Sequence, residues 1–412
     1  MTINSFAFLF FFGVLFIVYY LPFVKRYQWI LLLAASYIFY GLAGNHNLIY
    51  IVITTVVTHI GANLLDQKNG IQEDYVKSQK GILPKAEIKA YKEKIKKEKQ
   101  KISFVCIFIN LGLLVVIKYG RFLAGNIGLI FGKPNLAELS FLQIAVPLGI
   151  SYYTLISIGY LLDVSKGKCR SEKNFFKTAL FVSYFPQITQ GPFSRFPDMA
   201  EKLFGKHDFS YEKLSYGCQR ILWGFFKKMV IADRMKPMVD TIFGNYQEYS
   251  GFSLALGCMY FAIQLYADFS GYMDIVCGCS HVLGIELAEN FKRPFLSKSL
   301  AEYWRRWHIT LNAWFRDYLF YPLSISKAAV KFGRIGKKIF PPSIAKLTPS
   351  IFAMSIIWMA TGIWHDASWK YVFWGICNGA IIIASMCLEP WFVSLREKLH
   401  IKEENKLFRC LK

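Results

Sequence analysis

The sequence predicts an all-α fold: a polytopic integral membrane helical bundle of about ten or eleven membrane segments, some of them re-entrant or broken. Composition is the first reason, because 54% of the 412 residues are hydrophobic and only 18% are charged. Soluble domains average about a quarter charged residues. Patterning is the second reason: residues 28–65 contain no Asp, Glu, Lys or Arg. A bilayer core of about 30 Å needs about 20 such residues in a helix.

The expected membrane segments follow one another along the chain, and the later ones are short and interrupted. They cover residues 5–21, 28–43, 48–65, 102–118, 141–162, 175–190, 216–231, 252–266 with its broken continuation 269–287, 307–322, 350–364 and 369–388. The first has no basic residues ahead of it and no small-residue cleavage site. We therefore expect a retained helix rather than a signal peptide.

Basic residues mark the expected orientation. They follow the first, third and fifth segments, at residues 25–26, 68–101 and 166–177. All three links lie on one side if the N-terminus is extracytoplasmic, and the positive-inside rule then places the Lys-rich links in the cytoplasm. The net charge of +22 is thus a topology signal, and no nucleic-acid partner is expected.

The nine cysteines lie mostly inside or beside apolar runs. They lack the paired spacing of zinc ligands, since Cys277 and Cys279 are only two residues apart. We interpret them as small buried hydrophobic residues and expect no metal site.

Two carboxylates flank a glycine within an apolar stretch. Asp268, Gly271 and Asp274 occur where the chain should lie at membrane depth. Ionised groups there are costly and normally face the bundle interior, a partner or water. The glycine predicts a discontinuous helix. Functional carboxylates and a structural ion pair with a nearby arginine both fit this pattern.

A polar stripe is expected in the next segment. If residues 305–316 form one helix, Arg305, His308, Asn312 and Arg316 share a face. An aromatic stripe occupies another face. The pattern suits a helix at the wall of a wet cavity, and equally an interfacial helix whose arginines extend to the headgroups.

A third candidate is His365, which follows Trp364 at the end of an uncharged segment. An imidazole titrates near neutrality, so it can accept a proton from an attacking hydroxyl and later release it. A histidine at a segment end is also a common structural residue. No GxSxG elbow, P-loop or HExxH motif is present.

Taken together, these motifs resemble the membrane-bound O-acyltransferases, and most closely the branch that O-acetylates alginate. The resemblance covers most of residues 146–374. Its motifs are Asp268-Phe-Ser-Gly-Tyr, Glu289-Asn-Phe, Arg306-Trp-His308, Trp314-Phe-Arg-Asp-Tyr, Phe185-Pro-Gln with Gly191-Pro192, and Trp364-His365.

The resemblance implies a helical bundle around a tunnel, with an acyl donor entering from the cytoplasm and a hydroxyl acceptor from the opposite face. His365 matches the family's general base, and His308 would position or polarise the donor carbonyl. The residues expected to line or support the tunnel are Asp268, Asp274, Trp304, Arg305, Arg306, Asn312, Arg316, Asp317 and Trp364. The expected domains are residues 1–65 (N-terminal transmembrane helices), 66–101 (cytoplasmic Lys-rich amphipathic segment), 102–390 (catalytic core) and 391–412 (basic C-terminal tail).

The resemblance also implies substrates and partners. The donor would be acetyl-CoA or another acyl thioester, and no tightly bound cofactor is expected. The acceptor would be an extracytoplasmic polysaccharide or cell-wall polymer. An extracytoplasmic acetyltransferase-type protein is the expected partner, with membrane lipid around the bundle.

One departure and three alternatives stand beside this interpretation. The family usually has glycine after the final histidine, whereas this chain has Asp366. A carboxylate there would favour the charged imidazole and hinder a base at low pH, or it would orient the ring. The alternatives are D-alanyl transfer to teichoic acid, a transporter with coupling-ion sites at Asp268 and Asp274, and an inactive scaffold.

Overall fold

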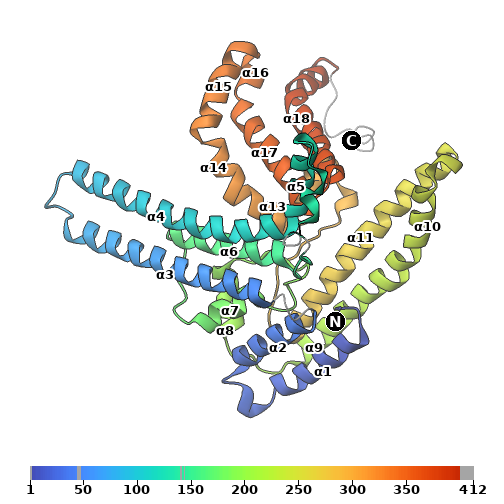
Figure 1. Ribbon diagram of the computed structural model, residues 1–412, viewed down its shortest axis with the longest axis horizontal. Helices are drawn as coiled ribbons and strands as arrows, with labels where there is room; N and C mark the ends of the chain where they lie inside the picture. Colours follow the sequence, from blue (N-terminus) through green and yellow to red (C-terminus); the bar gives the residue numbers. More distant parts are fainter. Residues whose placement is uncertain (1, 44–47, 140–141, 143, 400–412) are drawn as a thin grey trace. The chain divides into compact units, whose positions relative to one another are not determined.

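The computed structural model describes residues 2–43, 48–139, 142 and 144–399. Every regular element within these ranges is helical, which confirms the all-α prediction. Among the described residues, four helices are long and apolar enough to cross a membrane, at Leu48–Ser78, Lys85–Ile130, Gly251–Val282 and Trp369–Lys398. Figure 1 shows these and the shorter apolar helices.

The described chain forms two compact units. Unit 1 comprises residues 1–117 and 145–288, and unit 2 comprises residues 118–144 and 289–412. The expected boundaries at residues 65, 101 and 390 stay predictions. Residues 400–412 of the expected C-terminal tail lie outside the described part, as does residue 141, where the fifth expected segment begins.

The helices of unit 1 occur in the following order. They are α1 (Phe6–Tyr19), α2 (Gln28–Ala43), α3 (Leu48–Ser78), α4 (Lys85–Leu114), α6 (Ile150–Ser165), α7 (Phe175–Ser183), α8 (Phe196–Phe204), α9 (Tyr211–Phe225), the π-helical turn η6 (Phe226–Ala232), α10 (Asp233–Gly244) and α11 (Gly251–Val282). Several begin at a polar cap whose side-chain oxygen accepts main-chain N–H groups, such as Asn174 for α7 and Ser250 for α11. Figure 1 shows α3 and α4 as a long antiparallel pair.

The expected break at Gly271 is wrong, because α11 is one continuous helix. The glycines of α11 instead allow close packing against α9. A Cβ on Gly271 would lie 2.8 Å from the carbonyl oxygen of Gly224, and a Cβ on Gly278 would lie 2.8 Å from that of Gly217. Small residues that let two backbones approach are typical of helix pairs in membranes.

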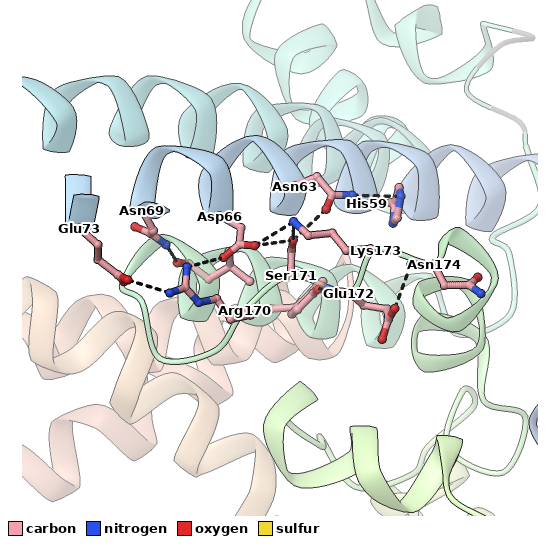
Figure 2. Close-up of polar contacts among 12 residues, drawn as sticks. His59, Asn63, Asp66, Asn69, Glu73, Arg170, Ser171, Glu172, Lys173 and Asn174 are labelled. Atoms are coloured by element: carbon pink, nitrogen blue, oxygen red, sulfur yellow. Dashed lines mark hydrogen bonds and ion pairs between the residues drawn. The ribbon is translucent and has the colours of Figure 1, made fainter. Parts of the chain in front are cut away.

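A polar network fixes the loop between α6 and α7 to α3 (Figure 2). The buried carboxylate of Asp66 accepts hydrogen bonds from Lys173 Nζ at 2.9 Å and Ser171 Oγ at 3.1 Å. Arg170 lies 3.6 Å from Asp66 and donates to Glu73 at 2.7 Å. Because these bonds join α3 to three loop residues, Arg170, Ser171 and Lys173, the loop is held in one conformation.

Unit 2 contains the remaining α-helices and π-helical turns. They are the π-helical turn η3 (Val115–Tyr119, of which residues 118–119 belong here), α5 (Gly120–Ile130), α12 (Leu300–Arg306), α13 (Ile309–Phe315), the π-helical turn η9 (Arg316–Phe320), α14 (Tyr321–Ser324), α15 (Lys327–Ile339), α16 (Pro342–Ala345), α17 (Thr348–His365) and α18 (Trp369–Lys398). The last two helices form an antiparallel pair joined by residues 366–368.

Glycines also bring α17 and α18 into contact. A Cβ on Gly362 would overlap the carbonyl oxygen of Tyr371, and a Cβ on Gly375 would overlap that of Trp358. The end of α17 and the start of α18 therefore approach to backbone contact. This close approach places His365 beside the aromatic residues that open α18.

Candidate active site

His365 is the last residue of α17, and aromatic rings surround its half-buried imidazole. The Tyr371 ring is stacked on it at a centroid distance of 5.9 Å, and the Trp374 ring meets it edge-on at 5.2 Å. Trp364 lies 5.0 Å away. No side chain in the described ranges hydrogen-bonds the imidazole of His365. Its ring nitrogens are therefore held in place by packing and can bond a substrate.

His308 lies at a sharp break between α12 and α13. Its backbone is left-handed, with φ +48° and ψ +51°. Positive φ is uncommon for residues other than glycine and often marks a functional site. The His308 side chain is buried, and its Nδ1 atom lies 3.2 Å from Oδ1 of Asn290.

Asn290 explains why the helix breaks at this point. Its carbonyl oxygen accepts the main-chain N–H of Ile309 at 2.9 Å, and its side-chain oxygen accepts that of Thr310 at 3.1 Å. These are the first N–H groups of α13, which have no partner within the helix. A residue 18 positions before His308 thus supplies the cap that a local side chain usually provides.

The expected polar stripe on one helix is therefore wrong. Arg305 lies on α12, Asn312 on α13 and Arg316 at the start of η9, with the left-handed His308 between the first two. The broken backbone removes the regular spacing on which the stripe depended. The aromatic and leucine side chains that were expected on the other face, Trp307, Leu311, Trp314 and Tyr318, are all buried.

Both candidate histidines contact one tryptophan. The Trp364 ring lies 6.2 Å from the His308 ring and 5.0 Å from the His365 ring, centroid to centroid. Residues far apart in the sequence therefore meet in one aromatic cluster within unit 2. The structure brings together the pair that the sequence selected.

Trp304 and Asn312 support this cluster. The Trp304 ring packs on Trp358 at 4.9 Å and on Trp374 at 5.6 Å. The Asn312 amide donates to the carbonyl oxygens of Trp304 at 2.5 Å and Trp307 at 2.7 Å. Asn312 therefore satisfies the end of α12 across the break and fixes the tryptophans there.

The charged residues of the tract make local ion pairs. Arg306 pairs with Glu302 at 2.6 Å, and Arg316 with Asp317 at 2.9 Å. Arg305 is exposed. The two pairs join neighbouring residues within α12 and within η9.

Asp268 and Asp274 belong to unit 1 and form ion pairs there. Asp274 accepts from Arg220 Nε at 3.0 Å and also pairs with Lys227. Asp268 pairs with Lys228 at 2.6 Å. These pairs link α11 to α9 and η6, which is the structural alternative that the sequence left open.

Three residues of the site were not expected from the sequence: Asn290, Lys118 and Tyr119. Asn290 stood in a recognised motif but was not assigned to the site. Lys118 and Tyr119 bond the end of α17, as described below. A lysine at the end of an apolar segment was a usable signal, because charged residues at membrane depth usually have a defined partner.

The arrangement suits proton transfer next to an acyl group. A neutral imidazole without a protein hydrogen bond can accept a proton, and the aromatic rings around it shield part of its surface from water. In the part of the chain that the structure describes, no group of three or more His, Cys, Asp or Glu side chains is placed to hold a metal ion.

Comparison with known proteins identifies the reaction class as O-acyl transfer. Residues 169–334 match the family model of the membrane-bound O-acyltransferases, a range that includes His308. The chain is 30% identical over 379 residues to a probable alginate O-acetylase, AlgI, of Pseudomonas putida, covering 92% of this chain and 69% of that protein. It is 29% identical over 299 residues to a peptidoglycan O-acetyltransferase of Helicobacter pylori, covering 66% and 53%.

A third relative is named for the transfer of a different acyl group. The teichoic acid D-alanyltransferase of Bacillus subtilis is 28% identical over 256 residues, covering 59% of this chain and 60% of that protein. The family model, the extended match to AlgI and the apolar helices agree with one another. The chain belongs to the membrane-bound O-acyltransferase family and is a multi-pass membrane O-acyltransferase.

Proposed function

We propose that this protein transfers an acetyl group from a cytoplasmic acyl thioester, acetyl-CoA in the simplest case, to hydroxyls of an extracytoplasmic polysaccharide or cell-wall polymer. The observation that carries the proposal is the pair of histidines on Trp364, with the His365 imidazole hydrogen-bonded by no described side chain. The similarity to an alginate O-acetylase and to a peptidoglycan O-acetyltransferase supports acetyl as the group and a polymer as the acceptor.

In the proposed mechanism, His365 is the general base. Its neutral imidazole takes the proton of the acceptor hydroxyl while the hydroxyl oxygen attacks the thioester carbonyl carbon. The tetrahedral intermediate then expels the thiolate as the C–S bond breaks. The thiolate leaves as a thiol when the imidazolium returns the proton. His308, fixed by Asn290, would position the acyl donor.

D-alanyl transfer to a teichoic acid is the second candidate, favoured by the similarity to the Bacillus subtilis enzyme. The two candidates differ in the group that becomes ester-linked to the cell envelope. The chromosomal copy would be deleted from the protein's own cells and the protein restored from a plasmid, so that the proposed partner and the acceptor polymer are present. Mild base then releases ester-linked groups from washed envelope polymers, and both acetate and D-alanine are measured.

Acetate that rises with the wild-type protein, and not with His365→Ala, supports the proposal. D-alanine in its place supports the second candidate. If neither acetate nor D-alanine rises while the protein is present in the membrane, both candidate functions are contradicted.

We also propose that the N-terminus is extracytoplasmic and the turn between α3 and α4 cytoplasmic. The basis is the Lys-rich polar half of the hairpin, with 11 lysines in residues 67–101. A protease site inserted at Gly81, in that exposed turn, should be cut in inverted vesicles and protected in right-side-out spheroplasts. The reverse pattern would overturn the orientation.

The proposed partner is an extracytoplasmic acetyltransferase-type protein that brings the polymer to the membrane. The links expected on that side of this chain are short, and specificity for a polymer needs a larger surface. No tightly bound cofactor is proposed, and membrane lipid would surround the bundle.

A further inference from the structure

The C-terminal end of α17 depends on donors from outside the helix. The last carbonyl groups of a helix have no partner within it. Lys118 Nζ lies 2.5 Å from the carbonyl oxygen of Trp364 and 3.3 Å from that of His365. The Tyr119 hydroxyl donates to the Trp364 carbonyl oxygen at 3.2 Å. Two neighbouring side chains therefore hold the main chain of His365 and of the residue before it.

Charge strengthens this contact. The C-terminal end of a helix carries a partial negative charge, so a nearby ammonium group is stabilising. Lys118 Nζ also lies 5.7 Å from the centre of the Trp364 ring, within range of a cation–π interaction. Asp366, which follows the helix, acts electrostatically on the same lysine. Lys118 thus interacts with three consecutive residues, Trp364, His365 and Asp366.

Lys118 and Tyr119 lie in a local irregularity of the backbone. Val115–Tyr119 forms the π-helical turn η3, and Tyr119 is buried. Such turns rotate the side chains that follow and occur frequently at functional sites. The next helix, α5, contacts the start of α18, because Asn126 Oδ1 accepts from Trp369 Nε1 at 2.9 Å. Residues 118–126 therefore contact both sides of the α17–α18 turn.

We propose that Lys118 and Tyr119 are positioning residues for His365: they fix the terminal turn of α17 and, through it, the direction of the imidazole. The inference rests on the proposed function only for its consequence in catalysis. Since a displacement of about 1 Å at a catalytic group costs about a hundredfold in rate, loss of these donors should reduce acyl transfer without removing any reacting group.

The test combines a structural and a catalytic measurement. Lys118→Met keeps an unbranched side chain of nearly the same length and removes its charge and its hydrogen bonds. In the purified protein, hydrogen exchange of the amides of residues 363–368 should be about tenfold faster. In cells, base-released acetate should fall about tenfold or more at an unchanged protein level. Lys118→Arg keeps a cationic donor and should restore both measurements to within about threefold of wild type.

Two further variants keep the result interpretable. Lys133→Met alters an exposed lysine of the same unit and should match wild type in both measurements. If Lys118→Met lowers the amount of folded protein, both measurements are made on Tyr119→Phe instead. That variant keeps the ring and the lysine and removes one hydrogen bond to Trp364.

The positioning role is overturned if residues 363–368 exchange as in wild type in Lys118→Met, or if acetate stays at the wild-type level. It is also overturned if Lys118→Arg is as defective as Lys118→Met. Failure of the proposed function is a different result: wild type and His365→Ala then release equal acetate, while the exchange measurement still tests the contact.

Discussion

The Nδ1 atom of His308 lies 3.2 Å from the side-chain oxygen of Asn290, and that same oxygen also accepts the main-chain N–H and the hydroxyl of Thr310. Because an amide oxygen can only accept, Nδ1 carries the hydrogen and Nε2 is the acceptor atom of the neutral ring. Asn290 therefore fixes the backbone break, the tautomer and the orientation of His308 together.

Asn290→Ala should remove all three hydrogen bonds in a buried setting. The expected loss is about 2–4 kcal/mol of stability, with a large fall in base-released acetate. Thermal unfolding in detergent and the acetate assay measure the two effects. Thr310→Val, which loses only the hydroxyl bond, is the milder control. An Asn290→Ala protein with wild-type acetate would show that the orientation of His308 is unimportant.

The contact between α17 and α18 makes a second prediction. Gly375→Ala would place a methyl group against the Trp358 carbonyl oxygen and 3.1 Å from the Cα atom of Gly362. Backbone atoms cannot give way as a flexible side chain can, so a loss of about 1–3 kcal/mol is expected. Acetate should also fall, because His365 and Trp374 lie on these two helices.

Gly125→Ala is the matched control in the same unit, since its Cβ would meet Ala137 Cβ at an ordinary 3.6 Å. Its melting temperature and acetate should equal those of wild type. Equal behaviour of the two alanine variants would contradict the close packing described for α17 and α18.

Substitution of Asp274 distinguishes a structural role of its ion pairs from a role of this carboxylate in transport. Asp274→Asn leaves the cations of Arg220 and Lys227 without their carboxylate in a largely buried site. Breaking one side of a buried pair costs about 3–5 kcal/mol, so a large fall in melting temperature is expected. Adding Lys227→Met should recover part of it.

The control for this prediction is Asp240→Asn, which loses only an exposed pair with Lys236. It should change stability by less than about 1 kcal/mol. An Asp274→Asn protein with wild-type stability would contradict the structural interpretation and favour a coupling-ion site at Asp274.

The sequence predicted the all-α fold because long apolar runs have few alternatives in a bilayer. It did not predict the continuity of α11. In the sequence, Gly271 suggested a helix break. In the structure, it allows α11 to approach Gly224 of α9 closely. Pairwise packing of that kind is not visible in a single segment.

The site was predicted unevenly for a similar reason. His308 and His365 were identified from their motifs, and the structure places both on Trp364. The helical stripe through His308 failed because Asn290, distant in the sequence, accepts the first main-chain N–H groups of α13 and so starts a new helix after His308. Lys118 was missed although a lysine at the end of an apolar segment is a signal, because its partners are main-chain oxygens, which the sequence does not identify.

The loop held by Asp66 makes a prediction about cysteine reactivity. Burial raises the pKa of the Cys169 thiol to about 12, with the nearby carboxylates of Asp163 and Asp66 adding to the shift. A raised thiol pKa keeps the unreactive protonated form up to high pH, so about one molecule in ten thousand is a thiolate at pH 8. Alkylation of Cys169 by iodoacetamide at pH 8 should therefore be very slow and should accelerate only as the pH approaches about 12.

Asp66→Asn should release the loop and speed this reaction, because Lys173 and Arg170 lose the carboxylate that they share. Mass spectrometry of the peptide containing Cys169 gives the rate. Rapid alkylation in the wild type at pH 8, or no acceleration in Asp66→Asn, would contradict the fixed loop.

The most direct measurement of the central claim is base-released acetate from envelope polymers in cells that carry His365→Ala, His308→Ala or wild type at equal protein levels. Loss of a general base lowers the rate by about 10²- to 10⁴-fold, so His365→Ala should abolish detectable acetate, and His308→Ala should reduce it. His281→Ala, a histidine packed on Tyr216 in unit 1, should leave it unchanged. Wild-type acetate from the His365→Ala protein would contradict the account.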